Sequence, residues 1–425
     1  MQKLTLQRCT RRLCRIFLLL AFLPTGCTSI SKGVAEALLE QKTDDLRQCS
    51  IQGAAFDGLR QSLDQQSQAG GVTKVLMVHG IGTHLPGYAN RFRDGITLAL
   101  GLNITNAEHK TITISNPSLA RTGHPATLTI TRHTDAAQKR TLLFYELTWA
   151  GLTEAQKEQL AYDSQNNDGL KRAGINRTLK SFINGTVPDM LIYMGAGQPL
   201  ITDAVKQATC WMLGNRWADL PESGAHRCDD WPQTNYATLA QDRAYFITHS
   251  LGSLITIDTI QSFARQMAQN PGSPKVHTVQ HVLRDKEFTV FMLSNQLPLL
   301  QLGRSPQILT DKLQDFCGTD ALRAGQRILG QLRVVAISDP NDILSYPVRE
   351  DFARTTLDSR LCTELVNVSM NVAAEKDIFG ATSFADPLTA HSGYLEDERV
   401  TQLITDGVHA GAAPAPASCH WQEFR

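Results

Sequence analysis

Six short apolar runs, rich in β-branched residues and separated by stretches of helical periodicity, constrain the fold of this 425-residue chain more than any other feature. Runs that stay apolar without alternation are typical of strands buried on both faces of a parallel sheet. Strands that alternate with helices predict a mostly parallel, doubly wound α/β sheet, in which ligands bind at the carboxyl ends of the strands. The runs are Val75–Val78, Leu142–Tyr145, Ala244–Ile247, Phe288–Leu293, Leu332–Ile337 and Leu365–Met370.

The third run leads directly into Thr248-His249-Ser250-Leu251-Gly252, and the helical stretch Ser253–Ala268 follows. This order predicts a strand, a sharp turn and a helix, with Ser250 at the turn. Such a turn holds the hydroxyl clear of the sheet and beside the N–H groups at the start of the helix, which favour developing negative charge. Ser250 is therefore a candidate nucleophile, although an ordinary turn also fits the pentapeptide taken alone.

The pentapeptide resembles the G-x-S-x-G nucleophile elbow of the α/β-hydrolase superfamily, most closely the H-S-L-G form of lipases and esterases, with Thr248 where the first glycine is usual. Together with the residues described next, the resemblance covers residues 73–407. It implies an α/β-hydrolase domain with a large insertion or lid between residues 152 and 240. It also implies that an acid and then a histidine follow the nucleophile, at the ends of later strands.

His391 is the candidate base, because it lies among small and polar residues between the last apolar run and an expected final helix, Leu395–Ile404. A structural histidine is the competing interpretation. His409 and His420 also follow the candidate acids, but they come after that helix, in or near the tail.

Two carboxylates qualify as the acid after the run Leu332–Ile337. Asp339 precedes a proline and suits a turn. Asp342 is followed by apolar residues that can fix its loop, so we prefer Asp342 as the group that orients His391. Asp386 is an outside candidate.

The first run continues into His79-Gly80-Ile81-Gly82-Thr83-His84, which resembles the H-G motif after an early strand of lipases and esterases. The resemblance implies an oxyanion hole made by the N–H groups of Ile81 and Leu251. A dinucleotide-binding loop is the alternative, but the next glycine is Gly87, so the G-x-G-x-x-G spacing is not met. We therefore expect no cofactor.

The long segment of residues 152–240 has helical patterning over Asp189–Met194 and Leu200–Leu213, and we expect either a lid over the site or packing around the core. Alternation over Lys110–Ser115 and Ala126–His133 predicts a β-hairpin.

Outside the α/β domain, residues 27–72 are expected to hold the anchor, a linker and helices. The helical stretch is Val34–Leu63 and the polar linker is Gln65–Gly71. Residues 408–425 are expected to form an irregular tail, because Gly411–Ser418 is rich in Ala and Pro.

The N-terminus carries five basic residues before the apolar stretch Ile16–Leu23, and then Pro24-Thr25-Gly26-Cys27. This order predicts an export signal over residues 1–26, because a membrane-spanning helix needs about 20 apolar residues. Cys27 after Gly26 resembles a bacterial lipobox, which implies that Cys27 is lipidated and that the protein is anchored in the cell envelope. Plain secretion with cleavage nearby is the alternative.

Removal of residues 1–26 lowers the 41 Lys and Arg residues to 36, against 41 Asp and Glu, which argues against a nucleic-acid partner. Six cysteines then remain besides Cys27, an even number that suggests disulfides in an exported chain. Six cysteines allow 15 connectivities. We favour the pairs Cys210 with Cys228, Cys317 with Cys362, and Cys49 with Cys419. Metal binding is the weaker interpretation, because the mature chain has no close His/Cys cluster.

These features predict a membrane-anchored serine hydrolase that cleaves carboxylic esters, with lipid esters as one substrate class, through Ser250, Asp342 and His391. The alternative is a catalytically silent hydrolase fold that acts as an interaction lipoprotein of the envelope. Thr248 supports this alternative, since a β-branched residue can crowd the elbow. The sequence carries no signal for an oligomeric state.

Overall fold

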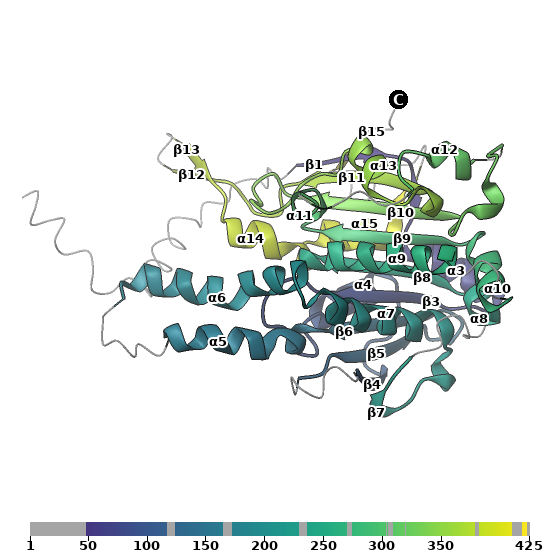
Figure 1. The fold of residues 1–425 in the computed structure, drawn as a ribbon, viewed down its shortest axis with the longest axis horizontal. Helices are drawn as coiled ribbons and strands as arrows, with labels where there is room; N and C mark the ends of the chain where they lie inside the picture. Colours follow the sequence, from purple (N-terminus) through teal and green to yellow (C-terminus); the bar gives the residue numbers. More distant parts are fainter. Residues whose placement is uncertain are drawn as a thin grey trace, which may run out of the picture. The chain divides into compact units, whose positions relative to one another are not determined.

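Eleven strands form one sheet in the computed structural model of this chain, in the order β15-β1-β11-β10-β9-β8-β3-β6-β5-β4-β7 (Figure 1). The structure describes residues 48–116, 124–164, 172–228, 236–269, 274–302, 304, 309–318, 320–378, 382–409 and 419–422. The expected signal peptide and Cys27 lie outside these ranges.

The centre of the sheet consists of six neighbouring parallel strands, in the order β6-β3-β8-β9-β10-β11. Each of the six apolar runs lies in one of them, so the predicted mostly parallel α/β sheet is confirmed. Every residue of β3 is buried, as a strand covered on both faces requires. The strands are β3 (Thr73–Val78), β6 (Thr141–Thr148), β8 (Arg243–His249), β9 (Glu287–Leu293), β10 (Gln331–Ser338) and β11 (Thr363–Met370).

Helices cover both faces of this sheet, and successive residues of β3 show the two layers. Leu76 and Val78 pack in one apolar core with α7, α8, α9 and α10, while Val75 and Met77 pack in a second core with α3, α4 and α15. The sheet is therefore doubly wound. The bounds of these helices are α7 Gln198–Gly214, α8 Tyr236–Gln241, α9 Leu251–Gln269, α10 Pro274–Leu283, α3 Leu59–Ala69, α4 Asn90–Ala99 and α15 Glu398–Asp406.

Antiparallel pairs flank the six central strands on both sides, and the outermost strands β7 and β15 pair in parallel with their neighbours. On one side β5 (Thr127–Thr134) pairs with β6 and with β4 (Glu108–Ile114), which confirms the predicted hairpin, and β7 (Ser223–His226) follows. On the other side β1 (Cys49–Gly53) runs antiparallel to β11. β15 (Cys419–Gln422) pairs in parallel with β1.

Three expectations for the chain ends are wrong. Residues 49–57 are not helical: they form β1 and the short β2 (Phe56–Asp57), and Cys49, Ile51 and Gly53 alternate inward as a one-sided edge strand requires. The expected linker is mostly helix, since α3 continues to Ala69. The tail is not irregular throughout, because Cys419–Gln422 is a strand.

The segment of residues 152–240 has two roles in the fold. α7 packs against α9 and β3 and belongs to the helical layer. In contrast, α5 (Glu154–Ser164) and α6 (Gly174–Met194) extend beyond the sheet on the side where α14 (Pro387–Ser392) also lies (Figure 1).

Short elements complete the connections. They are η2 (Ala150–Thr153), η3 (Trp217–Asp219), α11 (Leu297–Leu300), α12 (Leu313–Phe316), η5 (Ala324–Gln326), α13 (Glu350–Thr356), η6 (Ser359–Leu361), β12 (Lys376–Ile378), β13 (Thr382–Phe384), η7 (Gly393–Leu395) and β14 (Gly407–Val408). Within the described ranges, no helix has both the length and the apolar character needed to cross a membrane.

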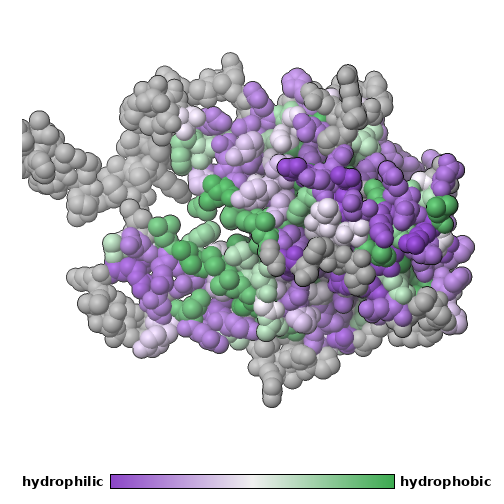
Figure 2. Space-filling model, turned by 45° about the horizontal axis from the view of Figure 1, so that its top comes forward, coloured by the Kyte–Doolittle hydropathy of each residue, from purple (hydrophilic) through white to green (hydrophobic). Residues whose placement is uncertain are grey.

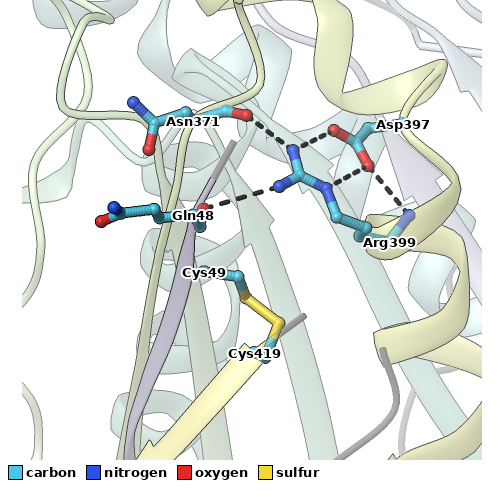
Figure 3. The surroundings of a disulfide bond; sticks show 6 residues. All are labelled: Gln48, Cys49, Asn371, Asp397, Arg399 and Cys419. Carbon is cyan, nitrogen blue, oxygen red and sulfur yellow. Dashed lines mark hydrogen bonds and ion pairs between the residues drawn. A yellow bond between two sulfur atoms is a disulfide. The ribbon is translucent and has the colours of Figure 1, made fainter. Parts of the chain in front are cut away.

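All three favoured disulfide pairs are present: Cys49–Cys419, Cys210–Cys228 and Cys317–Cys362. Cys49 and Cys419 are register partners in β1 and β15, so their bond joins two strands from opposite ends of the chain at one edge of the sheet (Figure 3). Arg399 lies beside this edge and donates to Asp397 and to the carbonyl of Asn371 at 2.6 Å (Figure 3). Disulfides of this number suit an oxidising compartment.

Candidate active site

Ser250 occupies a sharp turn between β8 and α9. The strand ends at His249, Ser250 has a φ of 54°, and the helix begins at Leu251. The N–H of Ser250 donates to the carbonyl of Leu293 at 2.9 Å and so stays joined to the neighbouring strand β9. A positive φ is unfavourable for a serine, and strained backbone of this kind is enriched at functional sites.

Two glycines let the backbone close around this turn. A β-carbon on Gly252 would lie 2.4 Å from the carbonyl oxygen of Val78, which is too close for any other residue. A β-carbon on Gly80 would lie 2.6 Å from the Cβ of Ser250. The turn after β8 and the loop after β3 are therefore in direct contact.

Thr248 fits the elbow although it is not a glycine. Its side chain is fully buried, and its Oγ1 lies 3.0 Å from the Oγ of Ser253 and 3.2 Å from the carbonyl oxygen of Phe291. Thr248 is not among the described residues that have a positive φ. The β-branched residue thus occupies an extended position in β8, which suits its side chain.

Asp342 and His391 are hydrogen-bonded. The Nδ1 of His391 lies 3.0 Å from Oδ1 and 3.2 Å from Oδ2 of Asp342, and the N–H of Leu344 also donates to Oδ1. Burial raises the pKa of Asp342, but its hydrogen bonds to His391, Ser294 and Leu344 and the charge of His391 outweigh this effect and hold the pKa below its ordinary value. Asp342 is therefore an ionised partner of the imidazole.

The two other carboxylates considered for this role have different partners. Asp339 accepts from the backbone N–H groups of Val372 and Ala373, at 2.7 and 2.9 Å, and so fixes the loop after β11. Asp386 caps α14, where its side chain accepts from the N–H of Leu388. The outside candidate Asp386 is thus not the partner of His391.

His391 lies in the six-residue helix α14. His249, the residue before Ser250, donates from Nε2 to the carbonyl of His391 at 2.8 Å and contacts its ring edge-on. Burial and the neighbouring His391 lower the pKa of His249 to about 3, so His249 is neutral and acts as a hydrogen-bond donor. The turn at Ser250 and the helix that carries His391 are in this way attached to each other.

The Oγ of Ser250 and the Nε2 of His391 are both buried, and neither has a hydrogen-bond partner among the described residues. Ser250 is 1% exposed. Hydrogen bonds between catalytic groups are often long before the substrate is bound, so this arrangement is compatible with a nucleophile and base that meet only in the complex.

The loop after β3 is fixed by a buried histidine. The Nδ1 of His79 lies 2.8 Å from the carbonyl oxygen of Gly80, its Nε2 accepts from the N–H of Trp149 at 3.0 Å, and the two rings are stacked. Burial and the nearby His84 hold the pKa of His79 well below its ordinary value, so this histidine is neutral. Neither Ile81 nor Leu251 donates its N–H to another described residue, and Leu251 is fully buried.

Asp189, on α6, was not expected to take part in the site. It is fully buried and accepts from the N–H of Gly82 at 2.7 Å and from the hydroxyl of Thr153 at 2.6 Å. Lys157 lies 2.8 Å from the same carboxylate. Asp189 therefore holds the loop after β3 in place. The sequence feature that could have indicated this residue is a lone carboxylate after Pro188, at the start of an apolar stretch.

Ser294, directly after β9, was also missed. Its hydroxyl contacts both Asp342 and His391. The remaining histidines considered as base lie elsewhere: His409 contacts Gln61 and Asp406, and His420 is in β15.

A cavity of about 600 Å³ lies at the other end of the sheet, where Gly330, Gln331 and Thr363 line it at the start of β10 and β11. It is separate from Ser250, which follows the carboxyl end of β8.

Comparison of the chain with protein-family models, with curated proteins and with solved structures finds no match.

Proposed function

We propose that this protein is a serine hydrolase of the α/β-hydrolase type. More particularly, we propose a lipid-anchored esterase of the bacterial envelope that acts on lipid esters. The observation that supports the first statement is a strained serine whose neighbour is hydrogen-bonded to a His–Asp pair. Ser250 lies on the turn after β8, and His249, the residue before it, donates to the carbonyl of His391, which is bonded to Asp342 after β10.

The chemistry assigned to these groups is acyl transfer. The hydroxyl proton of Ser250 passes to Nε2 of His391 while Oγ attacks the acyl carbonyl carbon. The N–H groups of Ile81 and Leu251 stabilise the tetrahedral oxyanion. The alcohol leaves with the proton from His391, and water then releases the acid by the same steps. Asp342 keeps the Nδ1 proton in place and stabilises the imidazolium.

Exposed apolar side chains support a lipid substrate. Of the fifteen large hydrophobic residues that are exposed in the described part of the chain, seven lie on α5 and α6: Leu160, Tyr162, Leu179, Phe182, Ile183, Leu191 and Met194. Figure 2 shows apolar side chains gathered on the left, the side toward which α5 and α6 extend in Figure 1.

This surface adjoins the site. A β-carbon on Gly82 would come 3.8 Å from the methyl group of Thr186 on α6, so the helix passes beside the loop after β3. Exposed Ile343 and Leu388 flank Asp342 and His391. Contiguous exposed apolar residues are typical of sites for apolar ligands or membranes. Together with the expected anchor at Cys27, they favour esters with long acyl chains.

One observation favours the alternative of a catalytically silent envelope protein: Ser250 is almost closed to solvent, and no hydrogen bond joins it to His391. Hydrolysis of p-nitrophenyl esters of increasing chain length by the purified mature protein distinguishes the two. We expect the rate to rise at long chains and to vanish in Ser250→Ala, while Ser262→Ala, on the helix that follows Ser250, keeps the wild-type rate. An absence of turnover at every length would favour the silent protein.

A further inference from the structure

Two serines with the same unusual backbone follow neighbouring strands. Ser250 follows β8 and Ser294 follows β9, and each has a φ of 54°. The N–H of Ser250 donates to Leu293, and the N–H of Ser294 donates to Ile337 at 3.1 Å. The same turn is thus repeated one strand further along the sheet, and only its first copy is used in the proposed function.

The hydroxyl of Ser294 lies at the junction of the acid and the base. Its Oγ donates to Oδ2 of Asp342 at 2.6 Å and lies 2.8 Å from Nδ1 of His391. A hydroxyl has one proton to donate and two lone pairs, so Oγ can donate to the carboxylate and still accept a hydrogen bond from the N–H at Nδ1 of His391. Ser294 is completely buried, so no water competes for these bonds.

The backbone at this position gives an independent reason to assign the hydroxyl a role. Glycine adopts a positive φ freely, whereas a side chain at φ 54° is strained. The hydroxyl is not needed to hold the segment, because the side chain of the next residue, Asn295, bonds to the carbonyl of Tyr346 and to the N–H of Leu297. The chain therefore has a strained serine where glycine would be easier to accommodate.

We propose that Ser294 is a positioning residue of the proposed hydrolase. It keeps the proton of His391 on Nδ1 and fixes the carboxylate of Asp342 beside that nitrogen, so that Nε2 keeps a lone pair and can act as the base. Ser294 is not the nucleophile, because its hydroxyl is bonded to Asp342 and lies on the Nδ1 side of the ring, away from Nε2. This inference rests on the function proposed above.

The substitution Ser294→Gly tests the inference, because glycine removes the hydroxyl and relieves the backbone at the same time. Ser294→Ala removes the hydroxyl and keeps the strain. We expect both variants to fold and to lose about 10- to 100-fold in kcat with little change in KM, since hydrogen bonds to charged groups have effects of this size. The acid limb of the pH profile moves to higher pH, because Asp342 loses a donor that lowers its pKa.

Gln138→Gly is the matched control. Gln138 also has a φ of 54°, in the turn between β5 and β6, so this variant relieves the same strain away from the site and keeps the wild-type kcat. Wild-type kcat and pH profile in Ser294→Gly would overturn the inference. So would a fluorophosphonate adduct on Ser294.

A spectroscopic readout separates failure of this inference from failure of the proposed function. Nitrogen-15 NMR of the His391 imidazole is expected to show the Nδ1-H tautomer in the wild type and a mixture of tautomers in Ser294→Gly. A shift of tautomer in a protein without esterase activity would keep the positioning role and reject the hydrolase. Unchanged tautomers in an active protein would reject the positioning role alone.

Discussion

Gly80 lies so close to Ser250 that a β-carbon on Gly80 would stand 2.6 Å from the Cβ of the serine. The loop that carries the proposed oxyanion donor Ile81 thus packs directly on the proposed nucleophile. This close packing is possible only because Gly80 has no side chain.

Gly80→Ala is therefore expected to displace this loop and to reduce kcat by about 100-fold or more, the size of effect seen when an oxyanion donor is lost. Gly95→Ala is the control, because a β-carbon there would have no atom within 4 Å and Gly95 is inside helix α4. The control should keep full activity and gain about 0.5–1 kcal/mol in the free energy of unfolding. Ester hydrolysis measures the activity of each variant, and urea unfolding measures its stability. Equal activity of the two variants would contradict the role given to the close contact of Gly80 with Ser250.

Asp342→Asn is expected to lower kcat by about 10³–10⁴-fold, because an amide cannot stabilise the imidazolium of His391. The pKa of Asp342 is depressed in the folded protein, so its charge stabilises the fold above its unfolded pKa and this contribution disappears as the pH falls through the folded value. The difference in unfolding free energy between wild type and variant should stay constant from pH 7 to about pH 4 and narrow below it. Urea unfolding across this range checks the sign; a difference that widens in acid would refute it.

Thr248→Gly introduces the glycine that is usual in a nucleophile elbow, but we expect this variant to be less stable and no more active than the wild type. The fully buried threonine loses its contacts with Ser253 and Phe291, and glycine adds chain entropy in a strand, so the free energy of unfolding should fall by about 1–3 kcal/mol. Activity should not rise above that of the wild type. A marked gain in kcat would show that Thr248 does crowd the elbow.

The disulfide between Cys49 and Cys419 joins residues 370 positions apart. Its removal in Cys49→Ala/Cys419→Ala frees the short strand β15 from β1 and should cost about 2–5 kcal/mol of unfolding free energy. The pair Cys210→Ala/Cys228→Ala opens a loop of only 18 positions and should cost less. Thermal unfolding of the two double variants ranks the effects, and the reverse order would contradict this expectation.

The sequence predicted the central strands well, because a strand buried on both faces is apolar at every position, as Val75–Val78 is. It did not predict β1. This strand has only five residues, of which Cys49, Ile51 and Gly53 are buried and the two between them are not. The partners of that strand lie in β11 and β15, more than 300 positions away, so no local pattern indicates it.

The residues of the candidate site also differ in whether a local sequence pattern indicates them. Ser250 and His391 are candidates from motifs and chain order, and their catalytic roles stay predictions. Of the two candidate acids, Asp342 is the one hydrogen-bonded to His391, while Asp339 bonds to backbone N–H groups. Ser294 and Asp189 were missed because each acts through a residue far along the chain: Ser294 reaches Asp342 only when β9 and β10 are neighbours, and Asp189 reaches Gly82 only when α6 lies on the loop after β3.

The most direct test of the central claim is to label the mature protein with a fluorophosphonate and to locate the adduct by peptide mass spectrometry. We expect one adduct, on Ser250, which is absent in Ser250→Ala and present in Ser262→Ala. An unlabelled wild-type protein, or an adduct that persists in folded Ser250→Ala, would contradict the assignment of Ser250 as the nucleophile.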